Sequence, residues 1–408
     1  MSWTTPLPKI YPVEYFDTAN LDAAGNLRTA EPNTIFESKL LFDADPLIWD
    51  DVEVSGSGTT NVHSVDTAST ILAVSAATAG KRVNQTFQRF NYQAGKSQKV
   101  IMTGVLDNAG GGAGIIRRLG IFDDDNGLFF EDNAGTYRVV RRTNVTGTPV
   151  DNAVAQSSWN IDKFDGAGPS KITIDFTKLQ VFLIDFLWLG GDRARMGFKI
   201  NGRVFYAHQF VAANTLDAVY MSTPNLPLRY DIENTGAGAV SSLEHICTSV
   251  ISEGGFQDIA LARSTSTAGT HVDANAIGTL YAVIGLRLKS THFSAMVRLA
   301  RMSMLAKTND DFEWSIVFNP TVAGTFTYND ETNSPVQVAK GATANTVTAG
   351  YLVDAGFTTG GSAIAQVVRD MRSLGSSIAG VADTIVLCAR PFTANLDIEG
   401  ALTWLEVR

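Results

Sequence analysis

The chain has 408 residues, a formal net charge of −9 and 18% charged residues, which is a low share for a globular protein. Because a domain usually holds about 100 to 200 residues, this length predicts two or three packed units. The acidic balance argues against nucleic acid as a partner, since binding to a phosphate backbone by counterion release needs clustered lysine and arginine.

Residues 1–35 predict an extended N-terminal arm. The segment has no helix or strand periodicity, and four prolines oppose both a helix and a central strand: Pro6, Pro8, Pro12 and Pro32. Such an arm either is disordered or lies across a neighbouring subunit. Four aromatic side chains would gain nothing on a disordered tail, so we expect docking onto an adjacent subunit; they are Trp3, Tyr11, Tyr15 and Phe16.

Neither a secretion signal nor a membrane span is predicted. The first ten residues are polar and contain two prolines, and no apolar run approaches the roughly 20 residues that cross a bilayer. We therefore expect a soluble protein with no membrane partner. The two cysteines, Cys247 and Cys388, lie far apart without a ligand motif around them, so we expect reduced core residues and neither a disulfide nor a zinc site.

Residues 36–240 predict a β-sandwich domain. Apolar and polar residues alternate with a period of two in segments 70–76, 99–106, 115–122 and 171–176. Residues 181–189 predict an apolar strand, and 195–200 is expected to pair with 203–210. Two Asn-Gly pairs, Asn126–Gly127 and Asn201–Gly202, predict type I′ hairpin turns. We interpret the basic pairs Arg117–Arg118 and Arg141–Arg142 as solvated strand ends.

Residues 241–408 predict a second, jelly-roll-like β unit, with a boundary near residue 240. Strands are expected at 280–288, 295–305, 312–318, 325–328, 384–389 and 396–407. Segment 363–374 instead has the i, i+3, i+4, i+7 spacing of a short amphipathic helix, at Ile364, Val367, Val368 and Met371. Short strands without βαβ alternation indicate an all-β chain of jelly-roll or β-sandwich units with few short helices.

Two glycine-containing segments resemble phosphate-binding loops only in part. Gly95–Ser97 matches the end of a P-loop, but Phe90 stands where the first glycine is required, and no helical pattern follows. Gly110–Gly114 lacks the third glycine of a dinucleotide fingerprint and lies between predicted strands. We therefore expect no nucleotide cofactor.

The acidic loop 123–132 offers oxygen atoms of the kind that calcium prefers. It begins with Asp123–Gly127 and continues to Glu131 and Asp132, but the EF-hand frame would place Phe122 at the first ligand position. We interpret the run as a hairpin turn, with a loop-bound cation as the alternative.

The sequence contains no recognisable catalytic motif. There is no Gly-x-Ser-x-Gly elbow, and the histidines have no metal-ligand spacing: His63, His208, His245, His271 and His292. We interpret His208 as a hydrogen-bonded structural residue. Asp175 and Asp185 lie on successive predicted strands and could form a glycoside-hydrolysing pair, an alternative that any β-protein of this size offers. We expect no enzyme, and we assign no catalytic, cofactor-binding or metal-binding residue.

One part of the chain resembles a known protein class. The motif residues are Trp159-Asn160, Asp165-Gly166, Pro169-Ser170, Ile174-Asp175-Phe176, Gln180, Asp185, Trp188-Leu189-Gly190, Gly197-Phe198, Gly202, His208, Asn214 and Tyr220 through Pro227. Over roughly residues 80 to 235, this pattern resembles a segment of structural proteins of tailed bacteriophages and related large DNA viruses. The resemblance implies a β-rich virion component and transfers no catalytic residue. The chain departs from the pattern at Gly190-Gly191-Asp192, where Gly-x-Gly is usual.

The resemblance, the low charge and the missing catalytic motif predict a structural component of a bacteriophage virion, either a capsid decoration or head fibre or a tail or baseplate subunit. Its partners would be copies of itself, as a homotrimer or another closed oligomer, and other virion proteins, with assembly in the host cytoplasm. The alternative is a lectin-like module of the particle that binds a host surface glycan or receptor.

Overall fold

The computed structural model describes residues 31–255, 257, 259–368, 372–393 and 395–407. Within these residues the regular structure is β-strand, apart from two single-turn 3₁₀ helices, Gln156–Ser158 (η2) and Ser290–His292 (η3). None of the described helices has the length and apolarity needed to cross a bilayer. The predicted all-β class is confirmed. Most of the predicted arm lies outside the described residues, and its end belongs to a strand, Pro32–Ser38 (β1).

The first of two sheets in the N-terminal sandwich has eight strands. Seven of them run side by side in the order β13 (Arg203–Val211), β12 (Arg193–Ile200), β11 (Gln180–Phe186), β6 (Ser97–Ala109), β15 (Ser241–Glu253), β4 (Ser69–Val74) and β3 (Thr59–Ser64). The eighth, β1, pairs with residues Thr248–Glu253 of β15, past the residues of β15 that pair with β4. All pairings are antiparallel. Because a β-strand is pleated, each strand presents alternate side chains to the interior.

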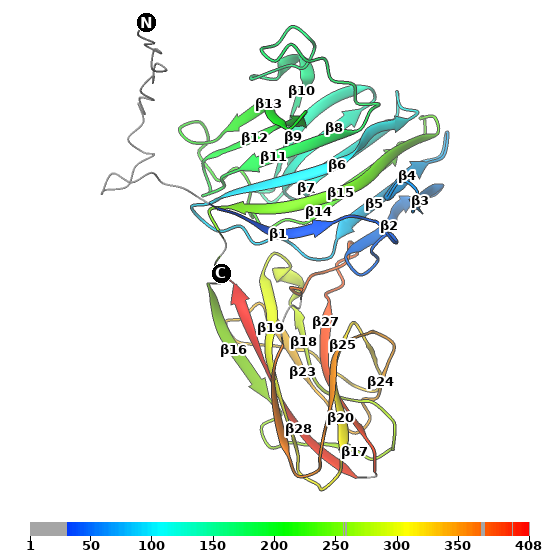
Figure 1. The fold of residues 1–408 in the computed structure, drawn as a ribbon, viewed down its shortest axis with the longest axis vertical. Helices are drawn as coiled ribbons and strands as arrows, with labels where there is room; N and C mark the ends of the chain where they lie inside the picture. The colour runs from blue at the N-terminus through cyan, green and yellow to red at the C-terminus, as the bar shows by residue number, and fades with distance from the viewer. Residues whose placement is uncertain (1–30, 256, 258, 369–371, 394, 408) are drawn as a thin grey trace, which may run out of the picture.

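The second sheet covers the first and has seven strands. Their order is β10 (Val150–Ala155), β9 (Thr136–Thr143), β8 (Gly127–Asn133), β7 (Ile115–Phe122), β14 (Leu228–Asn234), β5 (Gly80–Thr86) and β2 (Trp49–Gly56). Figure 1 shows the two sheets as stacked layers. Phe130 of this sheet lies 5.0 Å from Phe182 and 5.3 Å from Phe198 of the other, measured between ring centroids. Apolar side chains from both sheets thus form one core.

The C-terminal unit is a second sandwich. One sheet contains β16 (Ala260–Ser266), β28 (Leu396–Val407), β19 (Met296–Ala306) and β26 (Ala363–Val367), with β17 (Val272–Ala274) also pairing to β28. The other contains β22 (Asn329–Asp330), β23 (Val336–Lys340), β18 (Tyr281–Leu288), β27 (Thr384–Pro391), β20 (Phe312–Phe318) and β25 (Tyr351–Thr358). A two-stranded ribbon, β21 (Thr321–Val322) and β24 (Val347–Thr348), completes the unit, which has its own apolar core.

The predicted boundary near residue 240 is wrong. Strand β15 begins at Ser241 and lies between β6 and β4, in the middle of the N-terminal sheet. The first strand of the C-terminal unit comes after Glu253, where β15 ends. Sequence periodicity marked the loop before β15, but it contains no information about which sheet the next strand joins.

The predicted helix over residues 363–374 is also wrong. Residues Ala363–Val367 form β26, which pairs with β19. Beyond it, the Val368 and Leu374 amides donate to carbonyls of the residues around β19, at 2.9 and 2.8 Å. Val368 and Leu374 are buried beside β19, while Val367 stays exposed. Tertiary pairing overrides the local helical spacing.

The two Asn-Gly pairs form different turns. Asn201 and Gly202 have φ angles of 51° and 79°, and they link the paired residues Ile200 and Arg203, as a type I′ hairpin requires. Gly127 instead opens β8, where its φ is 147° and a Cβ atom would lie 2.1 Å from the Phe122 Cβ. The acidic loop is thus a hairpin with a longer turn than predicted.

The basic pair Arg117–Arg118 is not a solvated strand end. The Arg117 side chain is fully buried and forms ion pairs of 2.7 Å with both Asp107 and Asp132. Arg118 lies on the outer face of the sheet, 2.8 Å from Glu131. The alternation around these arginines points Arg117 inward with its apolar neighbours, so the carboxylates of Asp107 and Asp132 must compensate its charge.

Direct contacts join the two sandwiches. The Ser376 amide donates to the Phe87 carbonyl at 3.0 Å, and the Ile378 amide donates to Asp50 Oδ2 at 2.6 Å. Arg372 lies over the Phe87 ring of one unit and the Phe318 ring of the other, at 5.2 and 4.4 Å from the centroids. The segment around residues 372–378 therefore forms the main link between the units.

Candidate functional site

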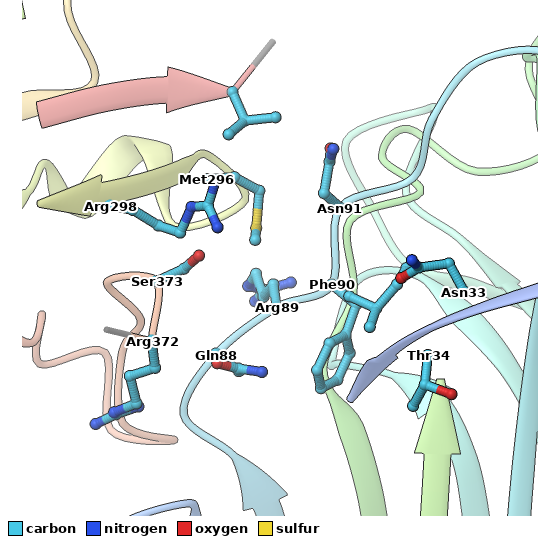
Figure 2. Close-up of a pocket in the computed structure, with 12 residues that line it drawn as sticks. Asn33, Thr34, Gln88, Arg89, Phe90, Asn91, Met296, Arg298, Arg372 and Ser373 are labelled. Carbon is cyan, nitrogen blue, oxygen red and sulfur yellow. The ribbon is translucent and has the colours of Figure 1, made fainter. Parts of the chain in front are cut away.

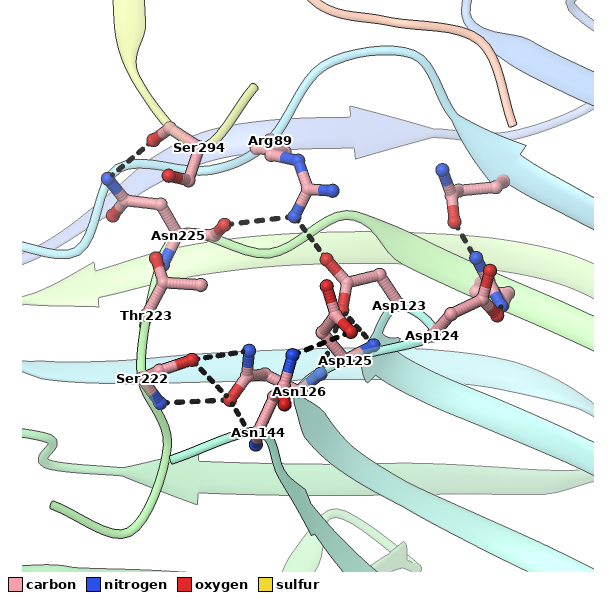
Figure 3. Close-up of polar contacts among 12 residues, drawn as sticks. Arg89, Asp123, Asp124, Asp125, Asn126, Asn144, Ser222, Thr223, Asn225 and Ser294 are labelled. Atoms are coloured by element: carbon pink, nitrogen blue, oxygen red, sulfur yellow. Dashed lines mark hydrogen bonds and ion pairs between the residues drawn. The ribbon is translucent and has the colours of Figure 1, made fainter. Parts of the chain in front are cut away.

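The segment Tyr220 to Pro227, which carries part of the virion-protein resemblance, connects several parts of the fold (Figure 3). Asn126 Oδ1 accepts from the Ser222 amide at 2.9 Å. Asn225 Oδ1 accepts from the Tyr92 amide at 2.9 Å, and its Nδ2 donates to the Ser294 carbonyl in the C-terminal unit at 3.1 Å. These polar residues hold loops and the unit junction together.

The carboxylates of the acidic loop already have protein partners. Asp123 Oδ1 accepts the amides of Asp125 and Asn126 at 2.9 and 2.8 Å, and its other oxygen accepts from Arg89 at 2.5 Å. Asp124 forms an ion pair with Arg229 at 2.6 Å. The later carboxylates of the loop, Glu131 and Asp132, are bonded to arginines of neighbouring strands. This arrangement favours the turn interpretation over a loop-bound cation.

Asp175 and Asp185 do not form a catalytic pair. Asp175 lies in the turn before β11, where it accepts from the Thr177 amide at 3.0 Å. Asp185 lies near the far end of β11, and at about 3.3 Å per residue the strand separates it by roughly 17 Å from Gln180, which bonds to the Asp175 carbonyl. Paired glycosidase carboxylates lie about 5–10 Å apart.

Asp185 belongs instead to a polar network across four strands, β6, β11, β12 and β13. It accepts hydrogen bonds from Ser97 Oγ at 2.6 Å, from Tyr206 Oη at 2.7 Å and from Arg195. Arg195 lies opposite Asp185 on the neighbouring strand and covers the Tyr206 ring at 4.2 Å. Burial alone would raise the pKa of Asp185, but these donors lower it below its ordinary value. Such a saturated carboxylate is a structural anchor and a poor general acid.

The buried histidines are neutral and structural. The Asn160 amide donates to His208 Nδ1 at 3.3 Å, and burial lowers the pKa of His208 to about 4. His245 is fully buried, stacks on the Tyr230 ring at 3.9 Å and has a pKa lowered to about 3 by burial. The predicted structural role of His208 is consistent with this packing.

One group could hold a metal ion among the described residues, namely His271, Asp273 and Asp397. Asp273 and Asp397 lie opposite each other on β17 and β28, and His271 Nε2 is 2.9 Å from Asp273 Oδ1. Lys307 Nζ, however, lies 3.5 Å from His271 Nδ1. The Lys307 ammonium beside the imidazole disfavours a second cation in this group.

The phosphate-loop resemblance and the cysteines have structural explanations. Lys96 Nζ donates to the Gln93 side chain at 2.8 Å and to the Gly255 carbonyl at 3.0 Å, so it holds the chain that leaves β15. Both cysteines have free thiols; Cys388 is buried in the core as predicted, whereas Cys247 is only partly buried. Burial raises the pKa of the Cys388 thiol, which makes it a poor nucleophile.

Three depressions could receive a ligand or a chain segment. One of about 540 Å³ lies at the end of the N-terminal sandwich and is lined by residues that include Tyr137, Gln156, Lys163, Asp165 and Thr173. The other two, of about 240 and 520 Å³, lie between the two sandwiches and have Arg372 in common. Sequence reasoning missed all three, because their walls come from residues that are distant in the chain.

No protein-family model and no curated protein matches this chain. Solved structures match it in part. An endo-1,3-beta-glucanase from Streptomyces sioyaensis has 12% identity and a TM-score of 0.36, over 55% of this chain and 97% of the other. The CBM2 module of the evolved Dit of Lactobacillus casei BL23 phage J-1 has 7% identity and a TM-score of 0.37, over 56% and 100%. A legume lectin-like domain from Entamoeba histolytica has 10% identity and a TM-score of 0.29, over 50% and 90%. At these identities and TM-scores, the likenesses assign no activity to the chain.

Proposed function

We propose that this chain is a structural component of a virus particle, a capsid decoration, head-fibre, tail or baseplate subunit that works by binding copies of itself and other virion proteins. The observation that carries the proposal is an unprotected side of the C-terminal sandwich, formed by the edge strands β25 and β26. We call it the open side and define it by Phe357, Val367 and Phe392.

The open side lacks the features that usually keep edge strands apart. Strands β25 and β26 each pair with a neighbour on one side only, within the described residues. Asp354 is the single charged residue in the two strands, which contain no lysine and no proline. Phe357 is 74% exposed and Val367 60% exposed. Natural edge strands are commonly blunted by charge or proline, so a neutral apolar edge favours a protein partner.

Two further features support the same proposal. The sequence segment that resembles phage structural proteins makes hydrogen bonds that join loops and units, which suits a rigid building block. The carboxylates and buried histidines that could serve catalysis are held by structural hydrogen bonds or packing. A subunit that bears load in a particle needs such rigidity and a surface for contact.

The mass of the purified chain in solution tests the proposal. We expect light scattering to give a closed oligomer, and the double substitution Phe357→Lys, Val367→Lys to reduce it to a monomer. The control is Val62→Lys, because Val62 is also 60% exposed on an edge strand, β3, but belongs to the N-terminal sandwich. A monomer at every concentration tested, or an oligomer that survives the double substitution, would contradict assembly through the open side.

A second candidate function is glycan binding by the N-terminal sandwich. The observation that favours it is the depression of about 540 Å³, which combines the Tyr137 ring with the side chains of Lys163, Asp165 and Thr173. Sugar rings bind where an aromatic face lies beside polar groups that fix orientation. A particle subunit could also use such a site to bind a host surface glycan.

Glycan binding is tested separately from assembly. We expect the unaltered chain to bind one class of glycan on an array, with binding reduced about tenfold or more by Lys163→Ala, a loss of about 1.4 kcal/mol. Lys178→Ala is the control, because Lys178 is a lysine outside the depression. An array without a reproducible signal would remove this candidate and leave the assembly proposal untouched.

A further inference from the structure

Many arginines of the described chain lie beside a carboxylate. Arg89 and Arg372, for example, line the depression between the sandwiches that Figure 2 shows, and they pair with Asp123 and Asp383 at 2.5 and 3.3 Å. An arginine with such a partner has little charge left to offer a ligand. Arg141 of β9 differs, because it is buried without a carboxylate partner.

The Arg141 side chain points into the N-terminal sandwich. Successive residues of a strand point to opposite faces, so Arg141 shares the inner face of β9 with the core residue Val139. Its guanidinium carbon lies 5.7 Å from the centroid of the Phe210 ring, which belongs to β13 in the other sheet. Interpreting Arg141 as a solvated strand end is therefore wrong.

No carboxylate among the described residues compensates the charge of Arg141. Its neighbour Arg142 shows the contrast, because Arg142 Nε and Nη2 donate to Asp151 at 2.7 and 2.8 Å. Burial lowers the pKa of Arg141, and the opposing contribution comes from Tyr220 alone. Burial raises the pKa of Tyr220, so its hydroxyl stays protonated and supplies no negative charge. A buried cation without a counterion is costly, and folded proteins usually pair it.

The guanidinium can be reached from outside. Arg141 Nε is enclosed without a partner, but the two terminal nitrogens are not enclosed, and the side chain is 8% exposed. Directly opposite Arg141 lies Asn152 of β10, an exposed residue on the strand at the edge of the sheet. Opposite residues of neighbouring strands point to the same side, with Cβ atoms about 4.5–5.5 Å apart. A small ligand at this edge can thus contact both side chains.

The chemistry of these groups suits an anion. A guanidinium presents two parallel N–H donors, which match two oxygens of a carboxylate or phosphate group. The Asn152 amide adds a further donor, and the Phe210 ring beside the guanidinium is uncharged. A bound anion would supply the negative charge that the fold itself does not place beside Arg141.

We propose that Arg141, with Asn152 beside it, forms a binding site for a small oxyanion, a phosphate or carboxylate group. The site is separate from the depression that contains Tyr137 and Lys163, since neither Arg141 nor Asn152 lines that depression. The proposal therefore depends neither on glycan binding there nor on assembly through the open side.

Calorimetric melting of the full chain tests the proposal, because a ligand that binds only the folded state raises the melting temperature. Inorganic phosphate and glucuronate, which carries a carboxylate, are added separately at low-millimolar concentration, with the ionic strength kept constant by chloride. At about ten times its dissociation constant, an anion should raise the melting temperature by roughly 2–4 °C. The anion that produces the rise identifies the group that binds.

Two variants should lose this rise. Arg141→Met removes the charge and keeps an unbranched side chain, and it should abolish the rise. Asn152→Ala, at an exposed position that leaves the core intact, should reduce it. The control is Arg203→Met, because Arg203 is an exposed arginine at the start of the edge strand β13. It should keep the full rise.

Three results would overturn the proposal. The first is a parent chain whose melting temperature responds to neither anion. The second is an equal rise in the parent, in Arg141→Met and in Asn152→Ala, which would indicate a general effect of salts on the protein. The third is an Arg141→Met chain that melts well below the parent without added anion. Loss of an unpaired buried cation should not destabilise the fold, so that result would assign Arg141 a structural role.

Discussion

In the N-terminal sandwich charged side chains are paired inside the fold and across its strands, whereas the C-terminal sandwich leaves neutral edge strands open. Asp231, Arg118, Glu131 and Arg138 are direct cross-strand partners on β14, β7, β8 and β9, in alternating sign. Opposite charges that face each other on neighbouring strands stabilise a sheet. Because these charges are already paired, they are not free to bind another protein. No comparable row runs along β25 and β26.

The difference separates two roles within one chain. A surface whose polar groups already bond to one another gains little from a partner, because binding would exchange existing hydrogen bonds for new ones. An exposed apolar edge gains both buried area and backbone hydrogen bonds. We therefore propose that the N-terminal sandwich serves as a rigid scaffold and that the C-terminal one offers the surface for docking.

The largest expected effect comes from removing the buried charge of the scaffold. Arg117→Ala leaves Asp107 and Asp132 without their compensating guanidinium, and we expect a loss of roughly 3–5 kcal/mol in the free energy of unfolding. Urea titration followed by tryptophan fluorescence measures it. Lys39→Ala, which removes an exposed ion pair with Glu37, should stay within about 0.5 kcal/mol. A loss of less than about 1 kcal/mol for Arg117→Ala would mean that the buried cluster is not a determinant of stability.

The interface between the units should give the next effect. Asp383 is buried, and its oxygens accept from the Gly375 amide at 3.0 Å and from Asn319 Nδ2 at 2.8 Å, beside the ion pair with Arg372. Asp383→Ala should cost about 2–3 kcal/mol and split unfolding into two transitions in calorimetry. Asp383→Asn, which keeps one acceptor oxygen, should cost less. A single, unshifted transition in the alanine variant would contradict a coupling role for this carboxylate.

Acid should weaken the scaffold before the docking unit. The folded-state pKa values of His208 and His245 are lowered to about 4 and about 3, below the ordinary value of 6.5. Their neutral forms are favoured in the fold, so stability is fully present above pH 6.5 and is lost as the pH falls toward these folded values, by up to about 1.4 kcal/mol per pH unit for each histidine.

Denaturant unfolding at a series of pH values measures this loss. His245→Gln should flatten the slope between about pH 6 and pH 4. An unchanged slope in His245→Gln would show that other groups dominate acid denaturation.

The smallest effect on stability is expected on the open side. Phe357→Lys should change the free energy of unfolding by no more than about 0.5 kcal/mol, because the ring is mostly exposed. Ile316→Ala, in the neighbouring strand β20 but fully buried, should cost about 2–5 kcal/mol. The comparison between the units would fail if Phe357→Lys unfolded the dissociated chain.

Local patterns predicted local structure well. The period of two in the first part of β6 and β7 matches alternating burial there. The Asn201–Gly202 turn has the predicted backbone because its two positive φ values depend on neighbouring residues alone. The same dipeptide at Asn126–Gly127 behaves differently, because Asp123 accepts the loop amides and Ser222, almost 100 residues away, bonds to Asn126.

The candidate sites were less accessible to sequence reasoning. Asp185 could be singled out as a strand carboxylate, but its partners Ser97 and Tyr206 come from other strands and turn it into an anchor. Arg117 and Arg118 are identical neighbours in sequence, yet one is buried and the other lies on the outer face. The depressions between the two sandwiches could not be predicted from residue spacing, because their walls meet only after both sandwiches have formed.

Strand periodicity and turn propensity act over a few residues, so they were enough to predict the all-β class, two sandwich units and the positions of most strands. Only contacts between distant segments place β15 in the first sandwich, make residues 363–367 a strand and select which charges are buried. These outcomes depend on hydrogen bonds and packing between segments far apart in the chain, and local preferences of about 1 kcal/mol or less are overridden by such contacts.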